Sequence, residues 1–244
     1  MIDLHCHLHF GIDDGPIDES STLEMMRAFH DAGVQEIACT PHIRSDKGWM
    51  NTRTAQAGQI ERLTKMLEAE GIDIKLHHGA EHYLDATLMM DVTKEDWVPY
   101  GSSQYVLLEL PYHGPPMRLF DLLHQVSSMK YRIVLAHLER FPYVVDDRES
   151  LQRIVDAGYL IQVNLGSLAG AYTRAHKKAA QFLVKNGFAS LACGDCHSAY
   201  DVDRFLLKGR KALRKLVGDE GVHRLTVENP QKILANALPY EIMP

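Results

Sequence analysis

The chain has 244 residues, of which 45% are hydrophobic and 24% charged, so it is long enough to bury a sizeable core and has an ordinary globular composition. Its formal net charge of -6 argues against a protein that coats nucleic acid or an anionic membrane, because both tasks need an excess of Lys and Arg. There is no apolar run of the roughly 18 residues that would cross a bilayer, and the first residues lack a secretory signal pattern. We therefore expect a cytoplasmic protein without membrane insertion.

The first half of the chain alternates short apolar runs with helical patterns. After an opening strand, Ser21 to Glu24 has the spacing of a capping box and predicts a helix that ends at Gly33. Pro41 is expected to end the second strand, because proline lacks a backbone donor. The further predicted elements are strands at about 34–39, 72–76 and 105–110 and helices at about 54–70 and 84–92.

The second half continues the alternation. It predicts strands at about 132–136, 159–163 and 188–193, and helices at about 119–129, 151–157, 175–185, 203–217 and 230–238. Near-continuous apolar strands of this kind are typical of a parallel sheet that is buried on both faces. We expect a single α/β domain over residues 1–244, either a closed barrel or a doubly wound sheet. No G-x-G-x-x-G follows the first strand, which disfavours a dinucleotide-binding sheet.

Four cysteines are too few and too scattered for a disulfide framework, so reduced thiols are expected. Cys193 and Cys196 form a C-x-x-C pair, which is compatible with a redox role or with half of a zinc site. No second pair completes such a site, and the pair ends a strand instead of opening a helix. We interpret it as incidental to function.

Ionisable side chains follow most of the predicted strands. They are His5 and His7 after the first strand, His42 after the second, Glu81 after the third, Glu109 at the end of the fourth, His137 after the fifth, and Asp195 and His197 after the seventh. In an α/β barrel these carboxyl ends meet at one rim, where the active sites of such barrels lie. His5 and His7 alternate along an extended chain, so both imidazoles face the same side. Asp14, in the first loop, is placed to join them.

Each residue also has a structural explanation when it is taken alone. His-x-His is compatible with a solvated strand end, and Glu81 and Asp195 with turn positions after glycine. Glu109 could pair with a buried arginine, and His137 could be a hydrogen-bonded core histidine. The coincidence across six strand ends favours a shared site. Imidazole and carboxylate ligands without an assured thiolate suit Mn²⁺, Fe²⁺ or Zn²⁺, and nine candidates exceed what one ion can use.

In this order the motifs resemble those of the PHP (polymerase and histidinol phosphatase) metallohydrolase family. The opening M-I-D-L-H-C-H, Asp13 to Pro16, Ala136 to Arg140 and Gln162 to Asn164 are similar to its bacterial protein-tyrosine phosphatase branch. The resemblance implies a distorted (β/α)7 TIM-like barrel and two or three divalent ions, with manganese favoured and iron or zinc as alternatives. It also implies a phosphotyrosine protein substrate, namely the tail of a bacterial tyrosine kinase of capsule or exopolysaccharide synthesis.

Carried over to this sequence, the resemblance implies three ligand groups and two arginines. The first ion would be held by His5, His7, Glu81 and Asp195, the second by Asp14, His42 and His197, and the third by Glu81, Glu109 and His137. Arg140 matches a family arginine near the phosphate. Arg204 is the candidate for the second catalytic arginine, although the family residue lies closer to the Asp-x-His motif.

We therefore expect metal-assisted hydrolysis of a phosphomonoester, without a cysteine nucleophile. A small substrate such as histidinol phosphate or a nucleotide is the main alternative. A nuclease is disfavoured because the acidic balance offers no evident nucleic-acid track. A non-catalytic metal-dependent regulatory module is the alternative from another class. The sequence leaves the oligomeric state open.

Overall fold

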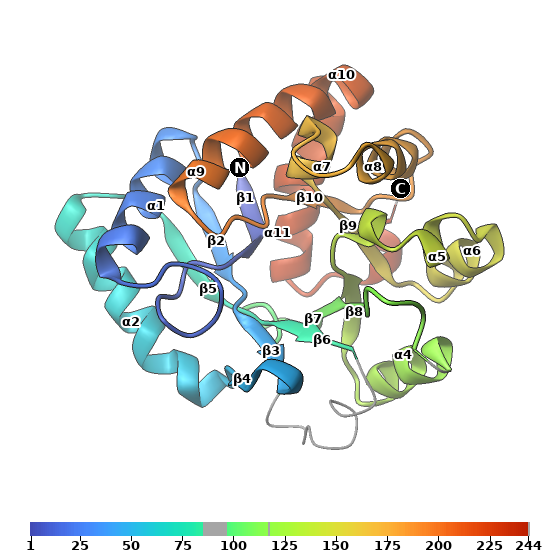
Figure 1. Cartoon of the computed structure of the whole chain (residues 1–244), viewed down its shortest axis with the longest axis horizontal. Helices are drawn as coiled ribbons and strands as arrows, with labels where there is room; N and C mark the ends of the chain where they lie inside the picture. Colours follow the sequence, from blue (N-terminus) through green and yellow to red (C-terminus); the bar gives the residue numbers. More distant parts are fainter. Residues whose placement is uncertain (85–96, 117, 244) are drawn as a thin grey trace.

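A computed structural model describes residues 1–84, 97–116 and 118–243. Short strands occupy its centre and helices surround them (Figure 1). The described strands are β1 (Ile2–Cys6), β2 (Glu36–Cys39), β3 (His42–Arg44), β4 (Trp49–Met50), β5 (Lys75–His78), β6 (Glu81–Tyr83), β7 (Tyr105–Glu109), β8 (Arg132–Leu135), β9 (Leu160–Asn164) and β10 (Leu191–Cys193). The described α-helices are α1 (Glu19–Asp31), α2 (Arg53–Glu70), α4 (Leu119–Ser128), α5 (Pro142–Val145), α6 (Arg148–Asp156), α7 (Leu165–Ala169), α8 (Arg174–Lys185), α9 (Ala199–Asp201), α10 (Lys208–His223) and α11 (Asn229–Leu234). None of the described helices is both long enough and apolar enough to cross a membrane.

The described strands form two sheets, so the predicted α/β architecture is confirmed, while no closed barrel ladder joins them within the described ranges. One sheet has the order β1-β2-β5 and the other β10-β9-β8-β7-β6-β3-β4. All neighbouring strands are parallel except the β3–β4 pair, which is antiparallel. Parallel strands with helical connections bring their carboxyl ends to one side of the molecule.

The chain passes from one sheet to the other at two short breaks between strands. β2 and β3 are separated only by Thr40 and Pro41, and β5 and β6 only by Gly79 and Ala80. A Cβ atom at Gly79 would lie 2.9 Å from Thr40 Cγ2, so this close approach of the two breaks requires glycine. On the other side of β1, Cys6 pairs with Cys196 in an isolated parallel bridge.

Ten strands are described where seven were predicted, because two of the predicted strands are each followed by a further short strand and β4 is added. Pro41 stops the hydrogen-bond ladder, as predicted, but the chain resumes an extended course in β3 and then turns back into β4. The strands predicted at 72–76 and 188–193 begin three residues later, as β5 and β10. The first residues of both segments instead form backbone hydrogen bonds with the preceding helix. Ile72 N donates to Leu67 O at 2.9 Å, and Phe188 N donates to Leu183 O at 2.9 Å.

The predicted capping box at Ser21 was wrong by one turn. Asp18 is the N-cap of α1: its side chain accepts from Ser21 N at 2.9 Å, and Asp18 N donates to Ser21 Oγ at 3.3 Å. The carboxylate of Asp18 is a capping group at least as strong as the hydroxyl of Ser21. The helix therefore starts at Glu19.

Further helix predictions differ at their ends. The segment predicted as a helix at 203–217 begins with π-helical Val202–Leu207 and continues as α10 through a kink at Gly218. The helix predicted at 230–238 ends at Leu234, because Asn236 adopts a positive φ of 60°. The helix predicted at 84–92 lies, apart from Leu84, outside the described residues.

The amino end of the strands is closed by apolar packing. Leu4, Leu107 and Leu191 belong to an inner hydrophobic cluster that also contains Ile233 of α11 and Ile242. Asn229 ties α11 to the strands, since its Nδ2 donates to Ser190 O at 2.6 Å. The carboxyl end is therefore the side on which the strand-end residues can form a site.

Candidate metal centre

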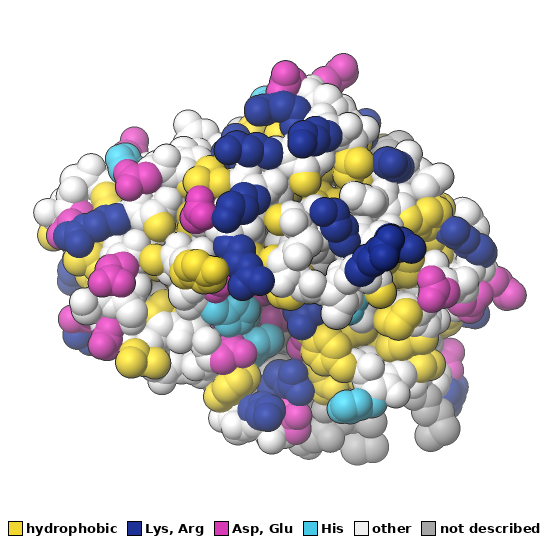
Figure 2. Space-filling view, turned by 45° about the horizontal axis from the view of Figure 1, so that its top comes forward, with side chains coloured by type: hydrophobic (Ala, Val, Ile, Leu, Met, Phe, Trp, Pro, Cys, Tyr) yellow, Lys and Arg dark blue, Asp and Glu magenta, His cyan; other side chains and the backbone are white. Residues whose placement is uncertain are grey.

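The nine predicted ligands converge at the carboxyl ends of the strands. A cavity of about 430 Å³ opens there. Seven of the nine residues line it, namely Asp14, His42, Glu81, Glu109, His137, Asp195 and His197. His5 and His7 lie behind them and are fully buried. Figure 2 shows this hollow in the middle of the face, with His and acidic side chains inside it.

Four buried side chains meet where β1 and β10 end and β6 begins. His5 Nε2 lies 3.2 Å from Glu81 Oε2 and 3.3 Å from Asp195 Oδ1. His7 Nε2 lies 3.4 Å and 3.5 Å from the same two oxygens. Tetrahedral ligands at about 2.1 Å from an ion are about 3.4 Å apart, so this spacing fits one metal ion. These are the four residues predicted for the first ion.

Neighbouring side chains orient the two histidines. His7 Nδ1 is 2.8 Å from Asp13 Oδ2, and His5 Nδ1 is 3.2 Å from Gln162 Oε1. These acceptors bind Nδ1–H and direct Nε2 of both rings toward the carboxylates, so that Nε2 is the atom available to a metal ion. Asp13 also accepts from His42 N at 3.0 Å, so it orders two loops around the site.

A second group is partly open to solvent. It contains His7, Asp14, His42 and His197. Asp14 Oδ1 lies 3.3 Å from His197 Nε2 and 3.5 Å from His42 Nε2. The side chain of Asp14 is 51% exposed, so this group faces the side from which a substrate arrives. The resemblance implies Asp14, His42 and His197 for the second ion and does not include His7.

A third group contains His42, where the resemblance implies His137. His42, Glu81 and Glu109 offer ligand atoms that all lie within 4.8 Å of one another. The predicted member His137 is also adjacent, with Nε2 2.8 Å from Glu81 Oε1 and 3.7 Å from Glu109 Oε1. Glu81 contacts histidines of all three predicted groups, which suits a bridging carboxylate.

The electrostatics of the cluster favour positive charge within it. Burial alone would lower the pKa of His5, but the carboxylates of Glu81 and Asp195 raise it to about 9. Burial raises the pKa of Glu109 to about 8, and the neighbouring charge of Glu81 adds to this rise. Buried carboxylates are poorly solvated, so a nearby cation stabilises their negative charge. This property is typical of a metal site.

Two of the strand-end residues have strained backbones. His137 has φ 30° and Asp195 has φ 52°, both in the left-handed region that non-glycine residues rarely adopt. Backbone hydrogen bonds hold these conformations: His137 N donates to Gln162 Oε1 at 2.7 Å, and Asp195 N donates to His5 O at 2.9 Å. Strain that is held in place in this way is typical of functional sites.

Two arginines line the same cavity. Arg140 Nη1 lies 3.6 Å from Asp195 Oδ2, and its guanidinium lies 4.9 Å from the ring centre of Tyr112. Arg44 Nη1 lies 3.5 Å from Glu109 Oε2. Sequence reasoning missed Arg44, although it is two residues after His42 on β3 and therefore faces the same side. Two guanidinium groups at the mouth of an acidic cavity suit an anion such as phosphate.

Arg204 is placed differently from Arg140. It is not among the residues that line the cavity, and its Nη2 donates to Ala171 O at 3.0 Å. Its neighbour in the chain, Phe205, lines the cavity instead. The catalytic role of Arg204 stays a prediction.

Polar side chains of β9 connect the ligands behind the cavity. Gln162 Nε2 donates to Asn164 Oδ1 at 2.8 Å, and Asn164 Nδ2 donates to Asp195 Oδ2 at 2.6 Å. Because Gln162 also contacts His5 and His137, the two amide groups together link three of the predicted ligands. The alternation Gln-x-Asn at a strand end, which places both side chains on one face, is the signal from which this network could have been found.

Comparison with known proteins gives one consistent family. The sequence profile of "Capsular polysaccharide synthesis, CpsB/CapC" matches residues 1–235. The tyrosine-protein phosphatase YwqE of Bacillus subtilis is 28% identical over 236 residues, which cover 97% of this chain and 92% of the relative. The tyrosine-protein phosphatase CpsB of Streptococcus pneumoniae is 23% identical and covers 98% of this chain and 100% of the relative.

The tertiary structure agrees with this similarity. A structure from crystallographic work on YwqE and CpsB, two metal-dependent tyrosine phosphatases, superposes with a TM-score of 0.87 at 28% identity. The superposition covers 97% of this chain and 95% of that chain.

Proposed function

Because the chain belongs to the CpsB/CapC family of capsular polysaccharide synthesis, we propose that it is a metal-dependent protein-tyrosine phosphatase. Similarity to relatives named tyrosine-protein phosphatases along almost the whole chain supports the reaction. The observation that carries the proposal is the set of three overlapping ligand groups beside Arg44 and Arg140 in one cavity.

We propose that His5, His7, Asp14, His42, Glu81, Glu109, His137, Asp195 and His197 hold two or three divalent ions. The buried atom His137 Nδ1, which has no hydrogen-bond partner in the described part of the chain, supports this assignment, because buried polar atoms normally have partners. Manganese is the favoured ion, with iron or zinc as alternatives, since the ligands are imidazoles and carboxylates. Such ions supply charge that stabilises phosphoryl oxygens and makes water nucleophilic near neutral pH.

The protein's own groups bind and position the phosphate. Arg140 and Arg44 stand at the mouth, where their donors can pair with phosphoryl oxygens as negative charge develops. Asp13 and Gln162 keep His7 and His5 in one tautomer, so the site needs little rearrangement during the reaction. A phenolate leaving group, with a pKa of about 10, reduces the need for a strong general acid.

A cysteine nucleophile has no support. Cys6, Cys39, Cys193 and Cys196 are free and buried, and burial raises the pKa of each thiol. A thiol of raised pKa carries little of the nucleophilic thiolate. The proposed reaction therefore differs from that of phosphatases that form a phosphocysteine.

We extend the proposal to the fold, the partner and the location. The continuation of β2 into β3 and of β5 into β6, with the Cys6–Cys196 bridge, supports one distorted (β/α)7 barrel as a single domain over residues 1–244. The substrate would be a phosphotyrosine protein, in particular the tail of a bacterial tyrosine kinase. The four unpaired thiols suit a cytoplasmic location.

The test measures phosphate release from a phosphotyrosine peptide, histidinol phosphate and a nucleotide, with and without Mn²⁺. We expect the peptide to be the best substrate and a chelator to remove the activity. A preference for histidinol phosphate or the nucleotide would replace the proposal with a small-molecule phosphatase. Metal binding without any hydrolysis would indicate a regulatory module.

Variants complete the test. His42→Ala and Asp195→Ala should abolish phosphate release and lower the metal content of the purified protein, while circular dichroism stays unchanged. His124→Ala, at an exposed position of α4, is the matched control. Near-wild-type activity of His42→Ala or Asp195→Ala with added Mn²⁺ would contradict the proposal.

A further inference from the structure

Positive charge is concentrated in one part of this acidic chain. Residues 170–217 contain ten Lys and Arg and three Asp, a formal charge of +7, although the whole chain carries -6. The rest of the chain therefore has a net charge of -13. Such an asymmetry creates a local positive field that net charge alone conceals.

Two neighbouring helices present these side chains in rows. Lys177 and Lys178 lie three and four residues after Arg174 on α8, so they share one helix face. Lys211 lies three residues after Lys208 on α10, and Arg204 precedes both. α7 contacts both α8 and α10, as Figure 1 shows.

We call these positive side chains of α8 and α10, together with Arg204, the basic surface. In Figure 2, Lys and Arg gather beside the hollow. The basic surface consists of Arg174, Lys177, Lys178, Arg204, Lys208 and Lys211.

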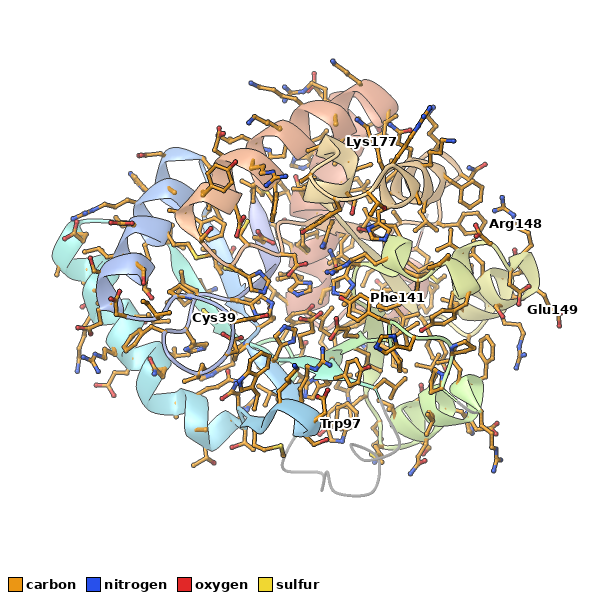
Figure 3. All side chains as sticks on the ribbon, in the orientation of Figure 1. Cys39, Trp97, Phe141, Arg148, Glu149 and Lys177 are labelled. Atoms are coloured by element: carbon orange, nitrogen blue, oxygen red, sulfur yellow. The ribbon has the colours of Figure 1, made fainter. Side chains whose placement is uncertain are left out.

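One short loop joins the basic surface to the wall of the cavity. Tyr172 lines the cavity, and the preceding carbonyl of Ala171 accepts from Arg204 Nη2 at 3.0 Å. One residue earlier, a Cβ atom at Gly170 would lie 3.3 Å from Lys177 Nζ. Figure 3 labels Lys177, which lies beside α7 and α8. Arg204 and Lys177 thus lie beside the two residues that precede Tyr172 of the cavity wall.

These charges are largely free of internal partners. Within the described parts of the chain, Lys208 is the one member that forms an ion pair, with Asp203 at 3.3 Å. Exposed arginines elsewhere do pair with carboxylates, for example Arg27 with Glu70 at 2.6 Å. Unpaired like charges side by side repel one another, and an acidic partner would relieve this repulsion.

The rim of the active-site cavity next to the basic surface has solvent-exposed apolar side chains. Ile17 is 83% exposed and Tyr200 is 69% exposed. Both line a second cavity of about 360 Å³, which shares His197 with the active site. The guanidinium of Arg204 lies 5.9 Å from the ring centre of Tyr200, so the apolar and basic parts of the rim adjoin. A pocket for individual side chains beside positive charge suits a polypeptide better than a lipid surface or a nucleic acid.

We propose that the basic surface binds acidic residues that flank the reacting phosphotyrosine of a protein substrate. This inference rests on the proposed phosphatase function and adds that the substrate segment is acidic. Complementary charge would accelerate encounter and hold the segment in register, and salt would weaken both effects.

The test compares two phosphotyrosine peptides of equal length, one with Asp and Glu around the phosphotyrosine and one with Ser and Gln. The readout is the ratio of their kcat/KM values at low and high KCl. In the wild type we expect the acidic peptide to be preferred about fivefold or more at low salt. The double variant Lys177→Glu/Lys178→Glu should bring the ratio close to one.

The matched control is Lys65→Glu/Lys75→Glu, which changes the net charge equally at two side chains that are each 69% exposed and lie outside the basic surface. It should keep the wild-type ratio, and all variants should keep the wild-type melting temperature. Equal use of the two peptides by the wild type would overturn this inference while leaving the phosphatase proposal intact. An equal loss in the control would overturn it as well, because the general field would then explain the preference.

Failure of every phosphotyrosine peptide with every metal would instead refute the proposed function, and this inference with it. Binding of the wild type to phosphatidylglycerol vesicles or to single-stranded RNA, without a peptide preference, would assign the surface to another partner and overturn the inference.

Discussion

The two ends of the parallel strands are built from different side chains, although the same strands supply both. At the amino end, Ile233 and Ile242 are buried in the inner cluster, and Asn229 Nδ2 donates to Ser190 O and Ile242 O. At the carboxyl end, buried Glu109 Oε2 has an ion pair with Arg44 at 3.5 Å but no hydrogen bond, and buried His137 Nδ1 has no hydrogen-bond partner among the described residues.

This difference shows how one fold separates stability from function. Buried polar atoms without partners cost free energy, so the carboxyl end lowers stability until ligands satisfy it. The amino end makes up for this cost with apolar burial and completed hydrogen bonds. Substitutions at the carboxyl end should therefore lower activity, and substitutions at the amino end should lower the free energy of unfolding.

The largest effect is expected at Glu81. Glu81→Gln removes a charge that contacts several ligands, so kcat/KM should fall by about a thousandfold or more, equivalent to over about 4 kcal/mol. Bound metal per chain should also fall when it is measured by mass spectrometry. Glu149→Gln, at an exposed position of α6, is the control. A fully metallated Glu81→Gln with over a tenth of wild-type activity would contradict the ligand assignment.

A substitution at the other end should act on stability alone. Ile233→Ala leaves a cavity among fully buried side chains, and we expect the free energy of unfolding in urea to fall by about 2–4 kcal/mol. The kcat of the folded enzyme should stay within about twofold. Leu238→Ala, at a side chain that is 40% exposed, should cost under about 1 kcal/mol. A large loss of kcat in Ile233→Ala at a temperature where it stays folded would show that the two ends are coupled.

A smaller effect is expected behind the ligands. Gln162→Leu removes the acceptor of His5 Nδ1 and the donor to Asn164, so metal affinity should fall about 10- to 100-fold. Gln162→Glu keeps an oxygen for His5 and should recover part of the affinity. Titration with Mn²⁺, followed by the rise in melting temperature, measures this without any activity assay. Gln152→Leu on α6 is the control, and wild-type affinity in Gln162→Leu would show that the network is only structural.

Much of the fold was predictable because its signals are local. The helix predicted at 54–70 is described as Arg53–Glu70, with Thr52 as its N-cap and Gly71 in the left-handed region at its end. The strand predicted at 105–110 is described as Tyr105–Glu109. The errors arose where a residue outside the recognised pattern set the end of an element. Asp18, for example, caps α1 three residues before the predicted cap.

By itself, the sequence determined which chemical groups reach the carboxyl ends of the strands, because strand ends and the alternation of side chains are local properties of the chain. It thereby indicated all nine side chains that the structure brings to one cavity or directly behind it. Only the tertiary structure showed which of these groups lie together: His7 beside the second group, His42 beside Glu81 and Glu109, and Arg44 in the lining of the cavity that Arg204 does not line. Which side chains lie together depends on how distant strands are paired, for example His42 opposite Glu81 and Cys6 opposite Cys196. A local sequence pattern does not contain this pairing register.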